Sequence, residues 1–171
     1  MVHIYCGDGK GKTTAAMGLA LRCAGSGCRA LVLQFLKDGS SSELAPLSRT
    51  EGAEVVPQTR AFGFTWTLSP EEREEAGIYY SGLLETAWEK ASAGGYGLLV
   101  LDEALGACAA GLIDEGRLLA LLDSAPEGLE VVLTGRGPSQ ALLDRADYVT
   151  EMRKVKHPFD RGVAARRGVE Y

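Results

Sequence analysis

The stretch CGDGKGKTT, residues 6–14, places three glycines and two lysines directly after the apolar run VHIY, residues 2–5. A usual phosphate-binding loop reads Gly, four residues, then Gly-Lys-Ser/Thr. Here only three residues separate Gly7 from Gly11, so the loop is one residue short. An apolar strand pattern, the glycines, Gly-Lys-Thr and a helical pattern still follow one another in the required order. The stretch therefore predicts a nucleotide-binding loop between a strand and a helix.

The chemistry of this loop follows from its residue types. Glycines allow positive φ and a close backbone approach, so successive amide N–H groups can point at one anion at the positive end of a helix dipole. Lys12 adds a charge for phosphate oxygens, and the Thr13 hydroxyl is placed to bind Mg²⁺. The alternative is a Gly-rich turn with two solvated lysines, but the order of the motif favours a nucleotide. The predicted nucleotide-binding residues are Gly7, Asp8, Gly9, Lys10, Gly11, Lys12, Thr13 and Thr14.

Length, charge and targeting patterns limit the class of protein. With 171 residues, of which 46% are hydrophobic, the chain is close to one domain of about 150 residues, so we expect a single domain over residues 1–171. The net charge of -5 gives no overall attraction to nucleic acid or acidic membranes, and only residues 153–167 are locally basic. There is no signal-peptide pattern and no long apolar run. We expect a cytoplasmic protein with no nucleic acid or membrane partner.

The four cysteines, Cys6, Cys23, Cys28 and Cys108, include no C-x-x-C pair and lie among apolar or small residues. This pattern predicts buried free thiols rather than a zinc site or disulfides. It fits a reducing compartment.

Apolar runs and helical patterns alternate along the chain. Short apolar runs typical of buried strands occupy residues 2–6, 29–36, 96–103 and 129–136, and helical patterns occupy residues 12–25, 69–95 and 113–124. A last short helix and strand are predicted at residues 139–146 and 147–152. This order predicts the α/β class: a single-domain P-loop nucleotide-binding fold with a mainly parallel sheet flanked by helices.

The segment at residues 37–68 is rich in Ser, Gly and Thr and contains only one weak strand pattern, residues 53–56. It is long for a compact domain, which is typical of a binding loop. The next helix should begin with Ser69 as N-cap, Pro70 at its first position and Glu72 completing a capping box. Its predicted apolar face consists of Ala76, Tyr80, Leu83 and Ala87.

The apolar run LLVLDE ends in two acids, Asp102 and Glu103. In P-loop proteins the carboxyl edge of the sheet is where ligands lie, so these acids are candidates for Mg²⁺. Alternatively, they are simply the polar end of a buried strand. Together with the loop, the pair favours metal binding, and spacing alone leaves open which acid contacts the ion.

Six segments in this order resemble the P-loop type of corrinoid adenosyltransferase, ATP:cob(I)alamin adenosyltransferase. They are GDGKGKTTAA (residues 7–16), LQFLKDG (33–39), GFTW (63–66), VLDE (100–103), LTGRG (133–137) and EMRKVKHPFDRGVAARRGVEY (151–171). The resemblance covers residues 2–171. Its specific parts are the shortened loop, the aromatic GFTW segment and the tail.

The resemblance implies that Co(I) of a corrinoid attacks the 5′ carbon of ATP and expels the whole triphosphate, in adenosylcobalamin biosynthesis or salvage. The phosphate loop, with Lys12, and Mg²⁺ would then stabilise the departing triphosphate. The corrinoid itself supplies the nucleophile, so no side chain need act as acid or base. The sequence indeed shows no Ser/His/Asp or Cys/His arrangement.

The resemblance also assigns residues and partners. Phe64 and Trp66 would pack at the lower face of the corrin and exclude water and the lower axial ligand, which adds them to Lys12 as catalytic residues. The alternative is that this pair pins the long loop to the protein. Thr13 and Glu103 would bind Mg²⁺, with Asp102 beside them. The implied partners are ATP, cob(I)alamin or a related corrinoid, an electron donor such as a flavoprotein, and a second copy in a homodimer.

Four further residues carry weaker signals. Lys37, Arg136 and His157 lie where they could reach the nucleotide, or could equally be surface ion pairs and a solvated tail, and His3 has a structural pattern. Two other functions stay open on the same core: an ATP-dependent kinase or phosphohydrolase, and a nucleotide-regulated binding protein. A kinase should bring a base or lid arginines for its acceptor, and none stands out.

Overall fold

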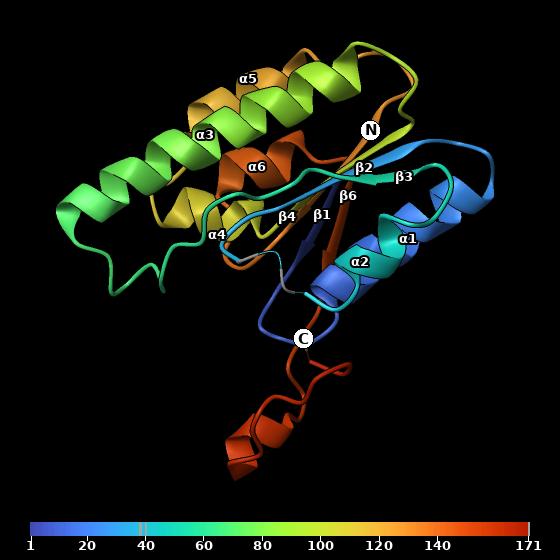
Figure 1. The fold of residues 1–171 in the computed structure, drawn as a ribbon. Helices are drawn as coiled ribbons and strands as arrows, with labels where there is room; N and C mark the ends of the chain where they lie inside the picture. The colour runs from blue at the N-terminus through green and yellow to red at the C-terminus, as the bar shows by residue number, and fades with distance from the viewer. Residues whose placement is uncertain (38, 40, 171) are drawn as a thin grey trace.

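A single parallel sheet forms the centre of the protein (Figure 1). The computed structural model describes residues 1–37, 39 and 41–170; Asp38 and Tyr171, which belong to two segments quoted above, and Ser40 lie outside the described residues. The strand order is β3-β2-β4-β5-β1-β6, and every neighbouring pair is parallel. The strands are β1 (Val2–Cys6), β2 (Ala30–Gln34), β3 (Ala53–Val55), β4 (Leu98–Asp102), β5 (Glu130–Thr134) and β6 (Tyr148–Glu151). The predicted fold class is confirmed, and the carboxyl ends of all six strands share one edge.

Helices cover both faces of this sheet. They are α1 (Lys12–Gly25), α2 (Leu44–Leu47), α3 (Pro70–Ser92), α4 (Ala104–Ala109), α5 (Glu115–Asp123) and α6 (Gln140–Arg145), and a short 3₁₀ helix, η1 (Pro158–Arg161), lies in the tail. Figure 1 shows α1 and α2 on one face and the other α-helices on the opposite face. Each face has its own apolar cluster. Strands β2 and β4 are buried at every position, because parallel strands covered on both faces have no solvent side.

Helix α3 begins as its sequence predicts. The Ser69 side chain accepts a hydrogen bond from the Glu72 N–H (3.1 Å), and the Glu72 carboxylate accepts one from the Ser69 N–H (2.8 Å). The predicted apolar face packs on the core: Ala76, Tyr80 and Ala87 are buried, and Leu83 is half-buried against the same cluster. Leu84, which the prediction did not include, is also buried. A period of 3.6 residues moves the buried stripe by a fraction of a turn along a helix of 23 residues.

The cysteine prediction is confirmed in part. All four cysteines, each within the described residues, carry free thiols. Cys6 is buried, and Cys23 and Cys108 are half-buried, but Cys28 is exposed. The expectation of burial was wrong for Cys28 because α1 ends at Gly25 and the chain turns at the surface before β2.

In the part of the chain that the structure describes, no helix combines the length and the apolar character needed to cross a membrane.

Candidate functional site

The phosphate loop joins β1 to α1 at the carboxyl edge of the sheet. Gly7 and Gly11 have φ of 103° and 117°, a conformation that side chains rarely adopt. The Gly9 N–H donates a hydrogen bond to the Met152 carbonyl (2.6 Å), and a Cβ added at Gly9 would lie 2.6 Å from the same oxygen. The chain after β6 therefore fixes the shape of this short loop. It also occupies the Gly9 N–H, so the loop amides do not all face an anion in this conformation.

Lys12 opens α1 and is buried with its ammonium group folded back on the loop. Its Nζ donates a hydrogen bond to the Gly9 carbonyl (2.8 Å). Burial lowers the pKa of Lys12, and repulsion from Arg136 lowers it further, while Glu103 and Asp8 oppose this shift. A buried cation at the amino end of a helix gives the loop the positive field that a triphosphate requires.

Asp102 lies at the centre of a buried network. Its Oδ1 accepts a hydrogen bond from the Thr134 hydroxyl (2.6 Å), and its Oδ2 accepts from Gln34 Nε2 (2.8 Å) and the Thr13 hydroxyl (3.2 Å). Lys37 Nζ lies 3.8 Å from Oδ2. Because this fully buried carboxylate is surrounded by donors, it is suited to orient Thr13 rather than to bind an ion alone.

Glu103 has left-handed backbone geometry, with φ of 59°. Its N–H donates a hydrogen bond to the Thr134 hydroxyl (2.9 Å), which helps hold this uncommon conformation directly before α4. Burial raises the pKa of Glu103, and the Asp102 charge raises it further, while Lys37, Lys12 and Arg136 oppose the shift. The structure thus brings Lys12, Glu103 and Asp102 into one electrostatic cluster at the sheet edge.

The donor set fits Mg²⁺ bound together with a substrate. Among the described residues, no group of three or more His, Cys, Asp or Glu side chains could enclose a metal ion. Thr13 and Glu103 instead offer one hydroxyl and one carboxylate. Mg²⁺ is typically held by one or two carboxylates plus waters and substrate phosphates rather than by an all-protein cage.

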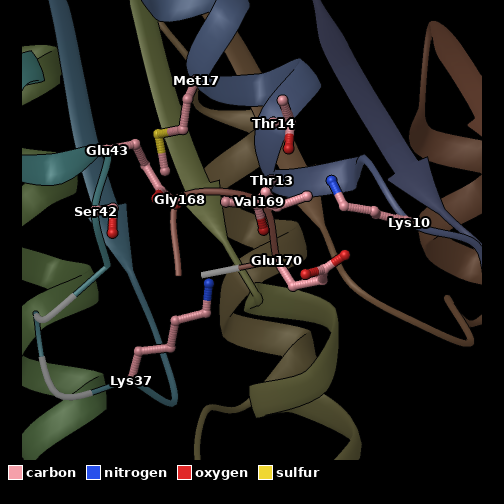
Figure 2. A pocket seen from close by; sticks show the side chains of 10 residues that line it. All are labelled: Lys10, Thr13, Thr14, Met17, Lys37, Ser42, Glu43, Gly168, Val169 and Glu170. Atoms are coloured by element: carbon pink, nitrogen blue, oxygen red, sulfur yellow. The ribbon is translucent and has the colours of Figure 1, made fainter. Parts of the chain in front are cut away.

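A cavity of about 590 Å³ opens at the phosphate loop (Figure 2), within the usual size range of small-molecule sites. Figure 2 shows Lys37 and Lys10 on opposite sides, with Val169 and Glu170 of the tail between them. Three separate segments form its wall: the loop with the start of α1, the chain after β2, and the tail. The lining residues are Lys10, Thr13, Thr14, Met17, Lys37, Ser42, Glu43, Gly168, Val169 and Glu170.

The tail projects away from the sheet around η1, where most of its residues are exposed, and its last described residues, 168–170, return to the cavity at the loop (Figure 1). Arg166 binds the Glu170 carboxylate through Nη2 (2.9 Å) and Nε (3.2 Å) and lowers the pKa of Glu170 to about 2. Lys10 also lowers this pKa. The tail carboxylate therefore carries its charge at the mouth of the phosphate loop.

Arg136 and His157, for which the sequence allowed either a nucleotide contact or a surface position, lie together beside the loop. They line a second cavity, of about 480 Å³, with Asp8, Lys154, Phe159 and Asp160. The Lys154 N–H donates a hydrogen bond to Asp8 Oδ1 (2.9 Å), which lowers the pKa of Asp8. His3, in contrast, has a structural setting, with its ring stacked on Tyr148 and 2.8 Å from Glu130.

The aromatic pair of the GFTW segment faces solvent. Phe64 and Trp66 are 67% and 77% exposed, and their rings stack 4.7 Å apart at 11°. The alternative in which this pair pins the loop does not match that exposure. Phe62 has that anchoring role, because its ring packs 5.6 Å from Tyr79 and 5.7 Å from Tyr80. Phe64 and Trp66 therefore present a flat apolar surface.

Sequence reasoning missed several residues around the site. Gln34 and Thr134 end the strands on either side of β4, and Gln34 is the register partner of Asp102. Polar residues at the ends of three neighbouring buried strands are a signal that could have identified them. Met152 and residues 168–170 gave no such signal, because their contacts with the loop come from the far end of the chain.

Comparisons with known proteins indicate one family over nearly the whole chain. A family model described as "ATP:corrinoid adenosyltransferase BtuR/CobO/CobP" matches residues 1–171. The chain is 36% identical over 172 residues to the corrinoid adenosyltransferase of Pseudomonas aeruginosa, covering 98% of this chain and 82% of that protein. It is 34% identical over 174 residues to corrinoid adenosyltransferase CobA of Salmonella typhimurium, covering 100% and 85%. For the corrinoid adenosyltransferase of Escherichia coli K12 the identity is 33% over 175 residues, covering 100% and 85%.

Proposed function

This chain belongs to the ATP:corrinoid adenosyltransferase family, and we propose that it transfers the 5′-deoxyadenosyl group of ATP to the Co(I) centre of a corrinoid, releasing tripolyphosphate. Family membership makes it a transferase of cobalamin biosynthesis. One observation best supports the transfer of the adenosyl group with release of tripolyphosphate. At one edge of the sheet, the shortened loop holds Lys12 through the Gly9 carbonyl and contacts the Asp102 network through the Thr13 hydroxyl.

Charge develops on the leaving group in this reaction. The cobalt electron pair forms the Co–C bond, the C5′–O bond breaks, and its electron pair leaves with the triphosphate, so no proton has to move. Lys12, the loop backbone and the amino end of α1 provide fixed positive charge where the triphosphate would lie. We infer that the loop, including residues 7–14, binds the leaving group rather than a transferring phosphoryl group.

Mg²⁺, when bound, would neutralise part of the triphosphate charge. We assign Thr13 and Glu103 to hold it, on the strength of the donor set described above. The hydrogen bond from the Thr13 hydroxyl to Asp102 keeps Thr13 oriented in the cluster. Asp102 then acts through Thr13 rather than on the substrate.

The corrinoid side of the proposal rests on Phe64 and Trp66. Their stacked rings supply an exposed apolar surface that suits the lower face of a corrin, where they would exclude water and the lower axial ligand. An electron donor such as a flavoprotein would supply Co(I) from Co(II), and a homodimer would be the assembled form. Both partners belong to the proposal.

The test is direct. Purified protein is mixed without oxygen with ATP, Mg²⁺ and chemically reduced cob(I)alamin, while the visible spectrum is followed and the phosphate product is identified. We expect conversion to adenosylcobalamin with release of tripolyphosphate. Appearance of ADP would instead indicate a kinase or phosphohydrolase, and ATP left intact with every corrinoid would indicate a binding protein. Either result would overturn the proposed reaction.

A further inference from the structure

Arg73, in the first turn of α3, contacts two other segments at once. Its Nη1 donates a hydrogen bond to the Ala110 carbonyl (2.7 Å), at the end of α4. Its Nη2 donates one to the Thr65 carbonyl (2.9 Å), between Phe64 and Trp66 in sequence. A planar guanidinium can donate in two fixed directions, which a lysine ammonium on a flexible stem does not match. Arg73 therefore bridges the aromatic segment and α4.

The aromatic segment, residues 63–67, has few other supports. It contains a turn in which the Thr67 N–H and hydroxyl both bind the Phe64 carbonyl (2.8 Å each). Among the described residues, the hydrogen bonds that reach this segment from outside come from Arg73 alone. Leu68, directly after the segment, packs against the larger apolar cluster, as Phe62 does before it, so both ends of the segment are anchored. Removal of the guanidinium would leave the turn intact but would release the part that carries the aromatic pair from α3 and α4.

The chain before this segment is held in a different way. The Tyr79 hydroxyl accepts hydrogen bonds from the N–H groups of Thr59 (2.9 Å) and Arg60 (3.3 Å), and Arg60 pairs with Glu75 (2.6 Å). The Phe62 ring packs on α3. These contacts end before the aromatic pair, so they do not replace Arg73.

The other end of the bridge leads to the candidate metal residue. Helix α4 starts directly after Glu103 and ends at Ala109, and Ala110 is its C-cap. The last carbonyls of a helix lack intrahelical partners, which makes Ala110 a good acceptor for a cation. Through α4, Arg73 connects the exposed aromatic surface with the polar cluster at the sheet edge.

We infer that Arg73 is a positioning residue, which fixes the stacked Phe64 and Trp66 rings relative to the edge where the triphosphate would bind. The inference rests on the proposed function, because it assumes that these rings contact a corrinoid. A displaced ring surface would no longer exclude the lower axial ligand from Co(II) and would misalign cobalt and C5′, without weakening the phosphate site.

The first experiment needs no substrate. The chain has two tryptophans, and Trp88 is buried, so Trp88→Phe leaves Trp66 as the single emitter. In that background, Arg73→Ala should give Trp66 a larger fast component in time-resolved fluorescence anisotropy, and Arg73→Lys an intermediate one. Arg117→Ala is the matched control, because it removes a surface arginine that contacts α3 through Glu85. Unchanged Trp66 anisotropy in a folded Arg73→Ala protein would overturn the inference.

The second experiment measures the reaction. Arg73→Ala should slow turnover from Co(II) corrinoid with reductant on the order of tenfold, more than turnover from preformed Co(I), with an unchanged KM for ATP. Increased Trp66 mobility with normal turnover would show that positioning does not matter and would overturn the inference. If the parent protein itself converts no corrinoid, the proposed function fails, while the anisotropy still decides whether Arg73 holds the segment.

Discussion

The proposed function joins the phosphate loop and the aromatic segment in one site, and the structure builds these two regions in opposite ways. Lys12 and Asp102 are buried, and hydrogen bonds fix them before any substrate arrives. Phe64 and Trp66 are mostly exposed, and their segment is held by the hydrogen bond from Arg73 to the Thr65 carbonyl. A buried charge without partners destabilises the folded state, so Lys12 and Asp102 need their hydrogen-bond partners before a substrate binds. An aromatic surface can face water until a ligand covers it.

Lys12→Ala should have the largest effect on ATP binding and turnover, since it removes the positive charge of the phosphate loop. We expect ATP binding and turnover to be lost together, with turnover reduced at least about 100-fold, as for loss of a key transition-state contact. Calorimetry with ATP and the spectral assay measure both. Lys90→Ala, which removes the exposed pair with Glu54, is the control. A Lys12→Ala protein with normal turnover would contradict the role of the loop.

Asp102→Asn tests whether the stability of the region around the phosphate loop depends on the buried hydrogen bonds of Asp102. An amide keeps one oxygen and puts a donor in place of the other, either where Oδ1 accepts from Thr134 or where Oδ2 accepts from Gln34 and Thr13. Leaving such groups unpaired costs about 1–3 kcal/mol in the free energy of unfolding. Denaturant unfolding measures that loss. Asp123→Asn, at an exposed pair with Arg145, should change stability little, and equal losses in the two variants would argue against the network.

Trp66→Ala tests the exposed aromatic segment. Because Trp66 is 77% exposed, we expect the free energy of unfolding to change by less than about 0.5 kcal/mol. Turnover from Co(II) corrinoid should nevertheless fall more than turnover from preformed Co(I). Ile78→Ala, at a residue 70% exposed on α3, is the control for loss of an exposed apolar side chain. Equal loss on both cobalt states would count against exclusion of an axial ligand.

Acid should act more weakly, through the tail that borders the phosphate loop. Arg166 lowers the pKa of Glu170 from its ordinary value of 4.5 to about 2. The ionised Glu170 therefore stabilises the turn between Arg166 and Glu170 above pH 4.5, and this contribution is lost as the pH falls from 4.5 through about 2. The carboxyl carbon shift of Glu170 in NMR reports the midpoint. Arg166→Ala should return that midpoint toward 4.5, and a wild-type midpoint already near 4.5 would show that the pair does not form in solution.

Local patterns predicted most of the fold. The apolar runs at residues 2–6 and 96–103 contain β1 and β4, and the capping box at Ser69 forms with both of its hydrogen bonds. These features depend on residues within a few positions of one another. The burial of Cys28 was mispredicted because it depends on how the chain turns after the end of α1, which no local period contains.

The site could be predicted only where its residues are close in sequence. Gly7 to Thr13 and Asp102 with Glu103 stand in short motifs, and the structure places both at the carboxyl edge, as expected for a parallel sheet. The Lys154 contact with Asp8 spans 146 positions, and Arg73 reaches Ala110 across 37. No spacing rule predicts such pairs.

The parallel α/β sheet, the shortened nucleotide loop and the family could be predicted from the sequence alone, because hydrophobic periods and compact motifs lie in continuous stretches of the chain. The folded chain was needed to show that Met152 shapes the loop, that residues 168–170 line the cavity beside it, and that Arg73 links the aromatic pair to α4. Those contacts depend on where the folded sheet and helices bring distant backbone carbonyls, and a carbonyl is present at every residue, so side-chain identity alone does not mark which ones will be used.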